Sequence, residues 1–212
     1  MKKAILLKTC SVVLMAATTA ILIAMTACKN NPTTPTTSTT FEDTFGKLVG
    51  SFNGVDAYSN RNSNYRSNQD NYYNGAITGK KWLCSEYVSR YYLQIYGFYI
   101  NTRDYDGYAT RFYQLARSQG GLLAYPNGGS VAPQVGDIIC GSVESGTSSH
   151  VAIVREVGSN YINVIQQNLY NSSLDNSQTL SRDGNHVDPF SVLYVVDGWL
   201  RNPGGANVRR FR

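Results

Sequence analysis

The spacing of apolar residues changes from helical to strand-like between the two halves of the chain. From residue 81 to 97, apolar and aromatic side chains recur at helical intervals, and Gly97 supplies a natural stop. A second helix is predicted at about residues 107–118. Short β-branched runs bounded by Pro, Gly, Asn and Ser follow and predict strands at 137–143, 150–157, 161–167 and 190–196. Helices followed by antiparallel strands predict an α+β fold.

The segments between the predicted helices and strands constrain the fold less. Residues 41–80 are rich in Asn, Ser, Tyr and Gly, which predicts a loop-rich segment with one apolar opening. The turn residues at 158–160 predict a hairpin between two of the strands. The polar insertion at 169–189 leaves its own course open.

The N-terminus has the three parts of an export signal: a Lys-bearing start, an apolar stretch, and small residues before Cys28. The end of this segment, at 25–28, resembles a bacterial lipobox, in which the peptide is cut before a Cys that then carries lipid. A transmembrane helix is the alternative, because the apolar stretch approaches spanning length. The small residues before Cys28 and the polar Lys29 directly after it favour the lipobox.

The segment after Cys28 lacks apolar side chains and carries Pro32 and Pro35, so it cannot pack into a core and predicts a semi-extended tether. We therefore expect an exported protein anchored by lipid to the bacterial cell envelope, facing the periplasm or the cell surface. The predicted parts are a lipoprotein signal peptide at 1–27, a lipidated Cys28 and tether at 28–40, a single folded domain at 41–205, and a basic tail at 206–212.

The net charge of +5 overstates the charge of the mature protein, because Lys2, Lys3 and Lys8 lie in the leader. The remainder has 16 basic and 14 acidic side chains. Nucleic-acid binders usually concentrate basic residues in a stripe, whereas the dense basic run here is the C-terminal tail. Nucleic acid is therefore not an expected partner. The Cys and His residues lack the paired spacing of zinc ligands, no calcium loop is recognisable, and we expect a monomer without metal or cofactor.

Two of the four cysteines are expected in the folded body, because Cys10 would be removed with the leader and Cys28 acylated. A disulfide between Cys84 and Cys140 is arithmetically possible in an oxidising compartment. Their surroundings differ, however. Cys140 follows two isoleucines and is typical of a buried core residue, whereas Cys84 stands at a predicted helix start. This contrast favours two separate thiols over a disulfide.

Cys84 and His150 are the candidates for nucleophilic chemistry. A thiol is mostly protonated at neutral pH, so it needs a neighbouring imidazole and benefits from a helix N-terminus. The imidazole in turn needs a third group to orient it, and the hairpin predicted at 158–160 brings residues 166–168 near His150. The order Cys, His, amide is that of papain-like thiol hydrolases. The other histidine, His186, lies in a polar run that predicts a surface loop.

Five segments resemble one known family. Residues 80–87 are similar to the "KWQCVE" nucleophile motif of CHAP domains, the cysteine- and histidine-dependent amidohydrolases/peptidases. Residues 136–139 and 149–154 resemble the "GD(L/I)" and "HVA(I/V)V" strands, and 165–168 resemble the "EQN" segment. Residues 53–60 are similar to the "GV-x-AYSN" segment of the branch that contains glutathionylspermidine and trypanothione amidases. The resemblance extends over roughly residues 45–200.

The resemblance implies a papain-like α+β fold, with N-terminal helices packed on an antiparallel sheet, and amide cleavage through a thioester. Carried over by position, Cys84 is the nucleophile and His150 the base. Gln166 stands where the family usually has Glu, and Asn168 stands where it has Asn. Gln166 cannot supply a negative charge, but an amide oxygen can accept the imidazole N–H, so either Gln166 or Asn168 could orient His150.

The residues before the nucleophile depart from the family. Leu83 replaces the Gln that normally precedes the catalytic Cys, which costs little if backbone N–H groups stabilise the oxyanion. Trp82 and Leu83 are carried over as candidate contributors to substrate binding. Tyr58 is a candidate second oxyanion donor by its position in the motif.

Three functions remain open. The anchor favours an envelope enzyme that cleaves peptidoglycan, either as an endopeptidase or as an N-acetylmuramoyl-L-alanine amidase. The segment 53–60 favours an amidase acting on a small peptide–polyamine conjugate such as glutathionylspermidine, although the leader argues against a cytosolic substrate. Gln166 and Leu83 favour a catalytically degenerate CHAP domain used as a binding module.

Overall fold

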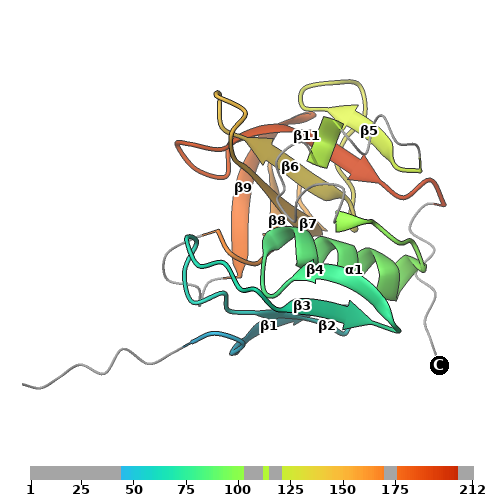
Figure 1. The fold of residues 1–212 in the computed structure, drawn as a ribbon. Coiled ribbons are helices and arrows are strands. Elements are labelled where there is room, and N and C mark those ends of the chain that lie inside the picture. The colour runs from blue at the N-terminus through green and yellow to red at the C-terminus, as the bar shows by residue number, and fades with distance from the viewer. Residues whose placement is uncertain (1–43, 103–111, 115–120, 170–175, 205–212) are drawn as a thin grey trace, which may run out of the picture. The chain divides into compact units, whose positions relative to one another are not determined.

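The structure is a computed structural model that describes residues 44–102, 112–114, 121–169 and 176–204 (Figure 1). The chain divides into two units, 1–40 and 41–212, and every described residue belongs to the second. The predicted signal peptide, tether and basic tail therefore lie outside the described residues. Within the described residues, no helix combines the length and apolarity needed to cross a membrane.

An antiparallel sheet of seven strands, in the order β10-β9-β8-β7-β6-β11-β5, forms the larger part of the fold (Figure 1). Its central strand β7 is apolar on both faces: Val151 and Ile153 pack into one core, and Ala152 and Val154 into the other. A strand buried on both faces needs such a continuous apolar run. The strands are β5 (Leu123–Pro126), β6 (Ile138–Ser142), β7 (Ser149–Val157), β8 (Tyr161–Ile165), β9 (Ser177–Asp183), β10 (His186–Val187) and β11 (Val195–Arg201).

Helix α1 (Cys84–Tyr96) packs against β7. Its buried residues, spaced one helical turn apart, include Val88, Tyr92 and Ile95. It ends at Gly97, whose φ of 65° is left-handed and whose N–H donates to the carbonyl oxygen of Leu93 at 3.1 Å. The predicted helix and its Gly97 stop are confirmed.

Two hairpins precede α1 and lie against it: β1 (Leu48–Phe52) with β2 (Val55–Tyr58), and β3 (Asp70–Tyr73) with β4 (Ala76–Lys80). Each turns on an Asn-Gly pair, at 53–54 and 74–75, in which both residues have positive φ. Asn and Gly adopt this conformation more easily than other residues, and it matches the twist of paired strands. In Figure 1 the strands β3 and β4 lie beside the helix.

The predicted α+β class, with N-terminal helices packed on a sheet, is wrong. The fold is mostly β, with a curled antiparallel sheet, and two hairpins joined by a loop at 59–69 precede α1 instead of helices. The Asn, Tyr and Ser of that segment favour turns and strand faces over helices. The predicted helix at 107–118 lies mainly outside the described residues. The part of it that the structure describes, 112–114, is helical.

Three predicted strands, 137–143, 150–157 and 161–167, correspond to β6, β7 and β8, with the hairpin at 158–160 between the last two. Of the strand predicted at 190–196, only residues 195 and 196 lie in a strand: residues 190–193 form a bend, and β11 runs from Val195 to Arg201. Val192 is fully exposed. Its β-branched side chain indicated a strand where the chain makes a surface bend.

Candidate active site

Cys84 is the first residue of α1, and its side chain is turned inward so that the residue is 8% exposed. Burial raises the pKa of its thiol. The N–H groups of Val151, Ser85 and Cys84 itself, and the positive charge of Arg66, act in the opposite direction and lower this pKa. Burial is the larger effect, so the thiol rests protonated and needs a base to remove its proton. The N–H groups directed at the sulfur would stabilise the thiolate once it forms.

His150 lies on β7, next to the Val151 whose N–H interacts with the Cys84 thiol. The residue is 3% exposed, and its ring meets Phe190 edge-on at a centroid distance of 5.2 Å. Cys84 and His150 line one pocket of about 400 Å³. Its lining comes from five places in the chain: 63, 64 and 66; 83–84; 147–150; 168–169; and 193–194. The predicted nucleophile and base therefore share a cavity.

A chain of amide hydrogen bonds fixes the orientation of the His150 ring. The Nε2 of Gln178, on β9, donates to the carbonyl oxygen of Phe190 at 2.6 Å. That carbonyl is only an acceptor, so Gln178 must direct its Oε1 towards Gln166, whose Nε2 donates to it at 3.4 Å. The Oε1 of Gln166 then lies 3.0 Å from Nε2 of His150. Because this oxygen can only accept, Nε2 carries the ring proton and Nδ1 holds the lone pair.

This arrangement leaves His150 neutral with a defined acceptor atom. Burial lowers its pKa to about 4, and the hydrogen bond to Gln166 offsets part of that effect. A neutral imidazole with its lone pair on Nδ1 can accept a proton from a thiol that shares its pocket. The geometry thus suits general-base activation of Cys84 better than a thiolate–imidazolium pair formed in advance.

The lowered pKa of His150 predicts a loss of stability in acid. The unfolded chain binds a proton on this histidine near pH 6.5 and the folded chain near pH 4, so acidification between these values favours unfolding. Urea unfolding at pH 7 and pH 4.5 should show an acid loss about 2 to 3 kcal/mol larger for the wild type than for His150→Gln. His186→Gln, at an exposed position on β10, should match the wild type. Equal losses in all three proteins would contradict this assignment.

Gln178 should affect turnover through the orientation of Gln166. Gln178→Leu removes the acceptor for the Gln166 amide, so that this amide can turn its N–H₂ towards His150 and favour the wrong tautomer. We expect kcat to fall by about tenfold or more with little change in KM. Gln178→Asn, which keeps an amide, should recover part of the loss. An unchanged kcat in Gln178→Leu would show that the relay has no effect on the base.

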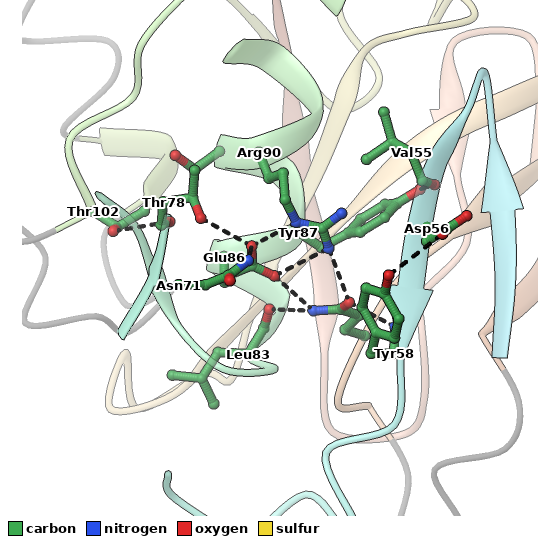
Figure 2. Close-up of polar contacts among 12 residues, drawn as sticks. Val55, Asp56, Tyr58, Asn71, Thr78, Leu83, Glu86, Tyr87, Arg90 and Thr102 are labelled. Atoms are coloured by element: carbon green, nitrogen blue, oxygen red, sulfur yellow. Dashed lines mark hydrogen bonds and ion pairs between the residues drawn. The ribbon is translucent and has the colours of Figure 1, made fainter. Parts of the chain in front are cut away.

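A buried ion pair lies beneath the start of α1 (Figure 2). Glu86 is fully buried and pairs with Arg90, one turn later, at 2.7 Å between Oε1 and Nε. Its carboxylate also accepts from Asn71 on β3 at 2.9 Å and from Thr78 on β4 at 3.0 Å. Gly79 lets β4 approach, because a Cβ there would lie 3.1 Å from the Glu86 Cα. The pair therefore joins α1 to the second hairpin.

Gln167 links this ion pair to the residue before Cys84 and to the end of β2. Its Nε2 donates to Glu86 Oε2 and to the carbonyl oxygen of Leu83, both at 3.1 Å. Its Oε1 accepts the backbone N–H of Tyr58 at 2.8 Å. Gln167 directly follows Gln166, so one residue connects the segment that orients His150 with the residue before Cys84.

The other predicted site residues differ in whether they contact His150 or line the pocket. Of the two amides proposed to orient His150, Gln166 contacts the ring, whereas Asn168 accepts from Asn60 Nδ2 at 2.9 Å and forms part of the pocket wall. Leu83 also lines the pocket. Tyr58 and Trp82 do not line it: their ring centroids lie 4.3 Å apart with the planes tilted by 38°, and the Tyr58 hydroxyl donates to Asp56 at 3.3 Å.

Several residues that position the site were not predicted. Glu86 and Arg90 stand four apart on a predicted helix, which is the spacing of an ion pair, but the sequence does not reveal that the pair is buried. Gln178 lies in the insertion whose course was left open. The Asn60 side chain accepts the backbone N–H of Trp82 at 3.1 Å and donates to the Asn168 side chain. This role is visible only once the chain is folded.

Residues 71–168 match the family model of the CHAP domain. The matched span begins after Tyr58 and contains Cys84, His150, Gln166 and Asn168. No curated protein matches the chain. CHAP domains are generally amidases or peptidases, and the match indicates a peptidoglycan-related hydrolase at the level of the family.

Proposed function

We propose that this chain is a cell-envelope cysteine amidohydrolase or peptidase that cleaves amide bonds of peptidoglycan through a thioester acyl-enzyme. The observation that carries the proposal is the pocket that Cys84 and His150 share, together with the amide relay that leaves Nδ1 of His150 as the proton acceptor. The family match to 71–168 supports hydrolysis of this kind. The leader and lipobox pattern support a location beside the cell wall.

In the first half of the reaction, Nδ1 of His150 takes the proton of the Cys84 thiol as the sulfur attacks the scissile carbonyl carbon. A C–S bond forms, and the carbonyl oxygen becomes an oxyanion near the N-terminus of α1. The N–H groups and dipole of a helix start stabilise negative charge there. The imidazolium then gives its proton to the departing amine as the C–N bond breaks, and a thioester remains on Cys84.

In the second half, a water molecule enters the pocket and His150 removes one of its protons. The resulting hydroxide attacks the thioester carbonyl, and the C–S bond breaks. The proton returns from the imidazolium to the Cys84 sulfur, which restores the neutral pair. Gln166 accepts the hydrogen bond from Nε2–H throughout, so it holds the ring in place without becoming charged.

Product identification tests the proposed function. Purified sacculi are incubated with the protein and the soluble fragments are analysed by mass spectrometry. We expect fragments that gain one water at an amide bond, with either a new peptide amine and carboxylate for an endopeptidase or an intact stem peptide with a free L-alanine amine for an amidase. The absence of soluble fragments in prolonged digestion would rule out peptidoglycan as the substrate.

A further inference from the structure

One charged side chain, Arg66, lies among the described residues that line the pocket of Cys84 and His150. The other described lining residues are Ser, Thr, Asn, Leu and Tyr, and none of them carries a carboxylate. The charge of Arg66 reaches the thiol, because it is one of the influences that lower the pKa of Cys84. The described part of the lining therefore carries a positive charge near the nucleophile.

Arg66 is hydrogen-bonded to its own loop, and hydrogen bonds connect this loop to the segment just before Cys84. Its Nη1 donates to the carbonyl oxygens of Ser63 at 2.7 Å and Tyr65 at 3.1 Å. Asn60 Nδ2 also donates to the Tyr65 carbonyl, at 2.9 Å, and Asn60 Oδ1 accepts the N–H of Trp82, two residues before the nucleophile. The loop that carries the guanidinium therefore keeps a fixed relation to the start of α1.

We infer that this pocket selects substrates that carry a carboxylate close to the scissile amide, and that Arg66 binds this carboxylate. A guanidinium has five N–H donors in a planar fork, so it can serve its own loop and hold a carboxylate at the same time. An uncharged pocket wall would not offset the cost of removing a carboxylate from water. The inference rests on the proposed function and specifies its substrate class.

The same charge disfavours the peptide–polyamine alternative. A polyamine is a polycation, and the described lining residues offer it Arg66 and no carboxylate. Peptides with free carboxylates have the opposite charge and are attracted. The charge of Arg66 therefore repels the polyamine part of such a conjugate.

Sacculi with and without free carboxylates provide the test. One portion is treated with carbodiimide and methylamine, which converts peptide carboxylates to neutral amides, and the other is mock-treated. The wild type should digest the mock-treated sacculi at least about tenfold faster, the usual effect of one charged hydrogen bond. Arg66→Gln should digest both portions at the slower rate. Arg61→Gln is the matched control, since Arg61 lies over the Tyr65 ring of the same loop but does not line the pocket.

The possible outcomes separate this inference from the proposed function. If the wild type digests both portions at the same rate, or if Arg66→Gln retains the preference, the inference is overturned while peptidoglycan cleavage stands. If no protein digests either portion, the proposed function fails, and binding decides the inference. Cys84→Ala should sediment with mock-treated sacculi more than with neutralised sacculi, and Cys84→Ala/Arg66→Gln should lose that difference. Equal sedimentation would overturn the inference.

Discussion

Cys84→Ala should lower the release of soluble fragments from sacculi to the level of a blank without protein, a loss of about a thousandfold or more. The reason is that Cys84 is the one thiol among the described residues that line the pocket, and removing the nucleophile of such a catalytic pair leaves only background catalysis. Fragment release, followed as loss of turbidity and by mass spectrometry, measures the effect.

Cys140→Ala is the matched control for this variant. Cys140 is a free thiol like Cys84, and it is buried in the core on β6. Its loss should leave a small cavity and cost about 1 kcal/mol of stability, while turnover stays within a few fold of the wild type. If both cysteine variants lost activity equally, or if Cys84→Ala retained it, Cys84 would not be the nucleophile.

Glu86→Leu should lower the free energy of unfolding by about 3 to 5 kcal/mol, the usual cost of leaving one partner of a buried ion pair uncompensated. Arg90 is 7% exposed and would keep its charge without the carboxylate, and Asn71 and Thr78 would lose their acceptor. Because the same carboxylate holds Gln167, activity should fall as well, even where the variant remains folded. Urea unfolding at neutral pH measures the stability.

The double variant Glu86→Leu/Arg90→Leu removes both charges and should recover at least half of the lost stability. A second control is the partly exposed pair Lys80–Asp70, at 2.6 Å, for which Asp70→Asn should cost less than about 1 kcal/mol. A double variant as unstable as Glu86→Leu would show that the buried charge of Arg90 is not the cause. The loss would then arise from packing alone.

The sequence predicts those parts of the fold and site that depend on local patterns. The spacing of apolar residues and the Gly97 stop predict α1, and the structure places Cys84 at its first turn. The β-branched runs predict β6, β7 and β8, and the hairpin between the last two brings Gln166 to His150. Each of these depends on neighbours within a few residues or across one turn.

The parts that were not predicted depend on contacts between distant segments. The Asn-Gly pairs at 53–54 and 74–75 are strong hairpin signals, but the strands beside them are polar and rich in Tyr, so the segment resembled a loop. Gln178 reaches Gln166 only because β9 pairs with β8. The pairing of β11 with both β5 and β6 makes residues 195–201 a strand. The apolar pattern of these residues is weaker than that of 190–196, where a strand was predicted.

In the proposed mechanism His150 removes the proton of Cys84, and the rate of alkylation of Cys84 by iodoacetamide reports on this proton transfer. The rate is measured at pH 5 to 8 by mass spectrometry of the peptide that contains Cys84, for the wild type and His150→Gln. We predict that at pH 7 the wild type is alkylated at least about a hundredfold faster than His150→Gln, because only the wild type has a base that receives the thiol proton. Equal rates in the two proteins across this pH range would contradict the transfer of the Cys84 proton to His150.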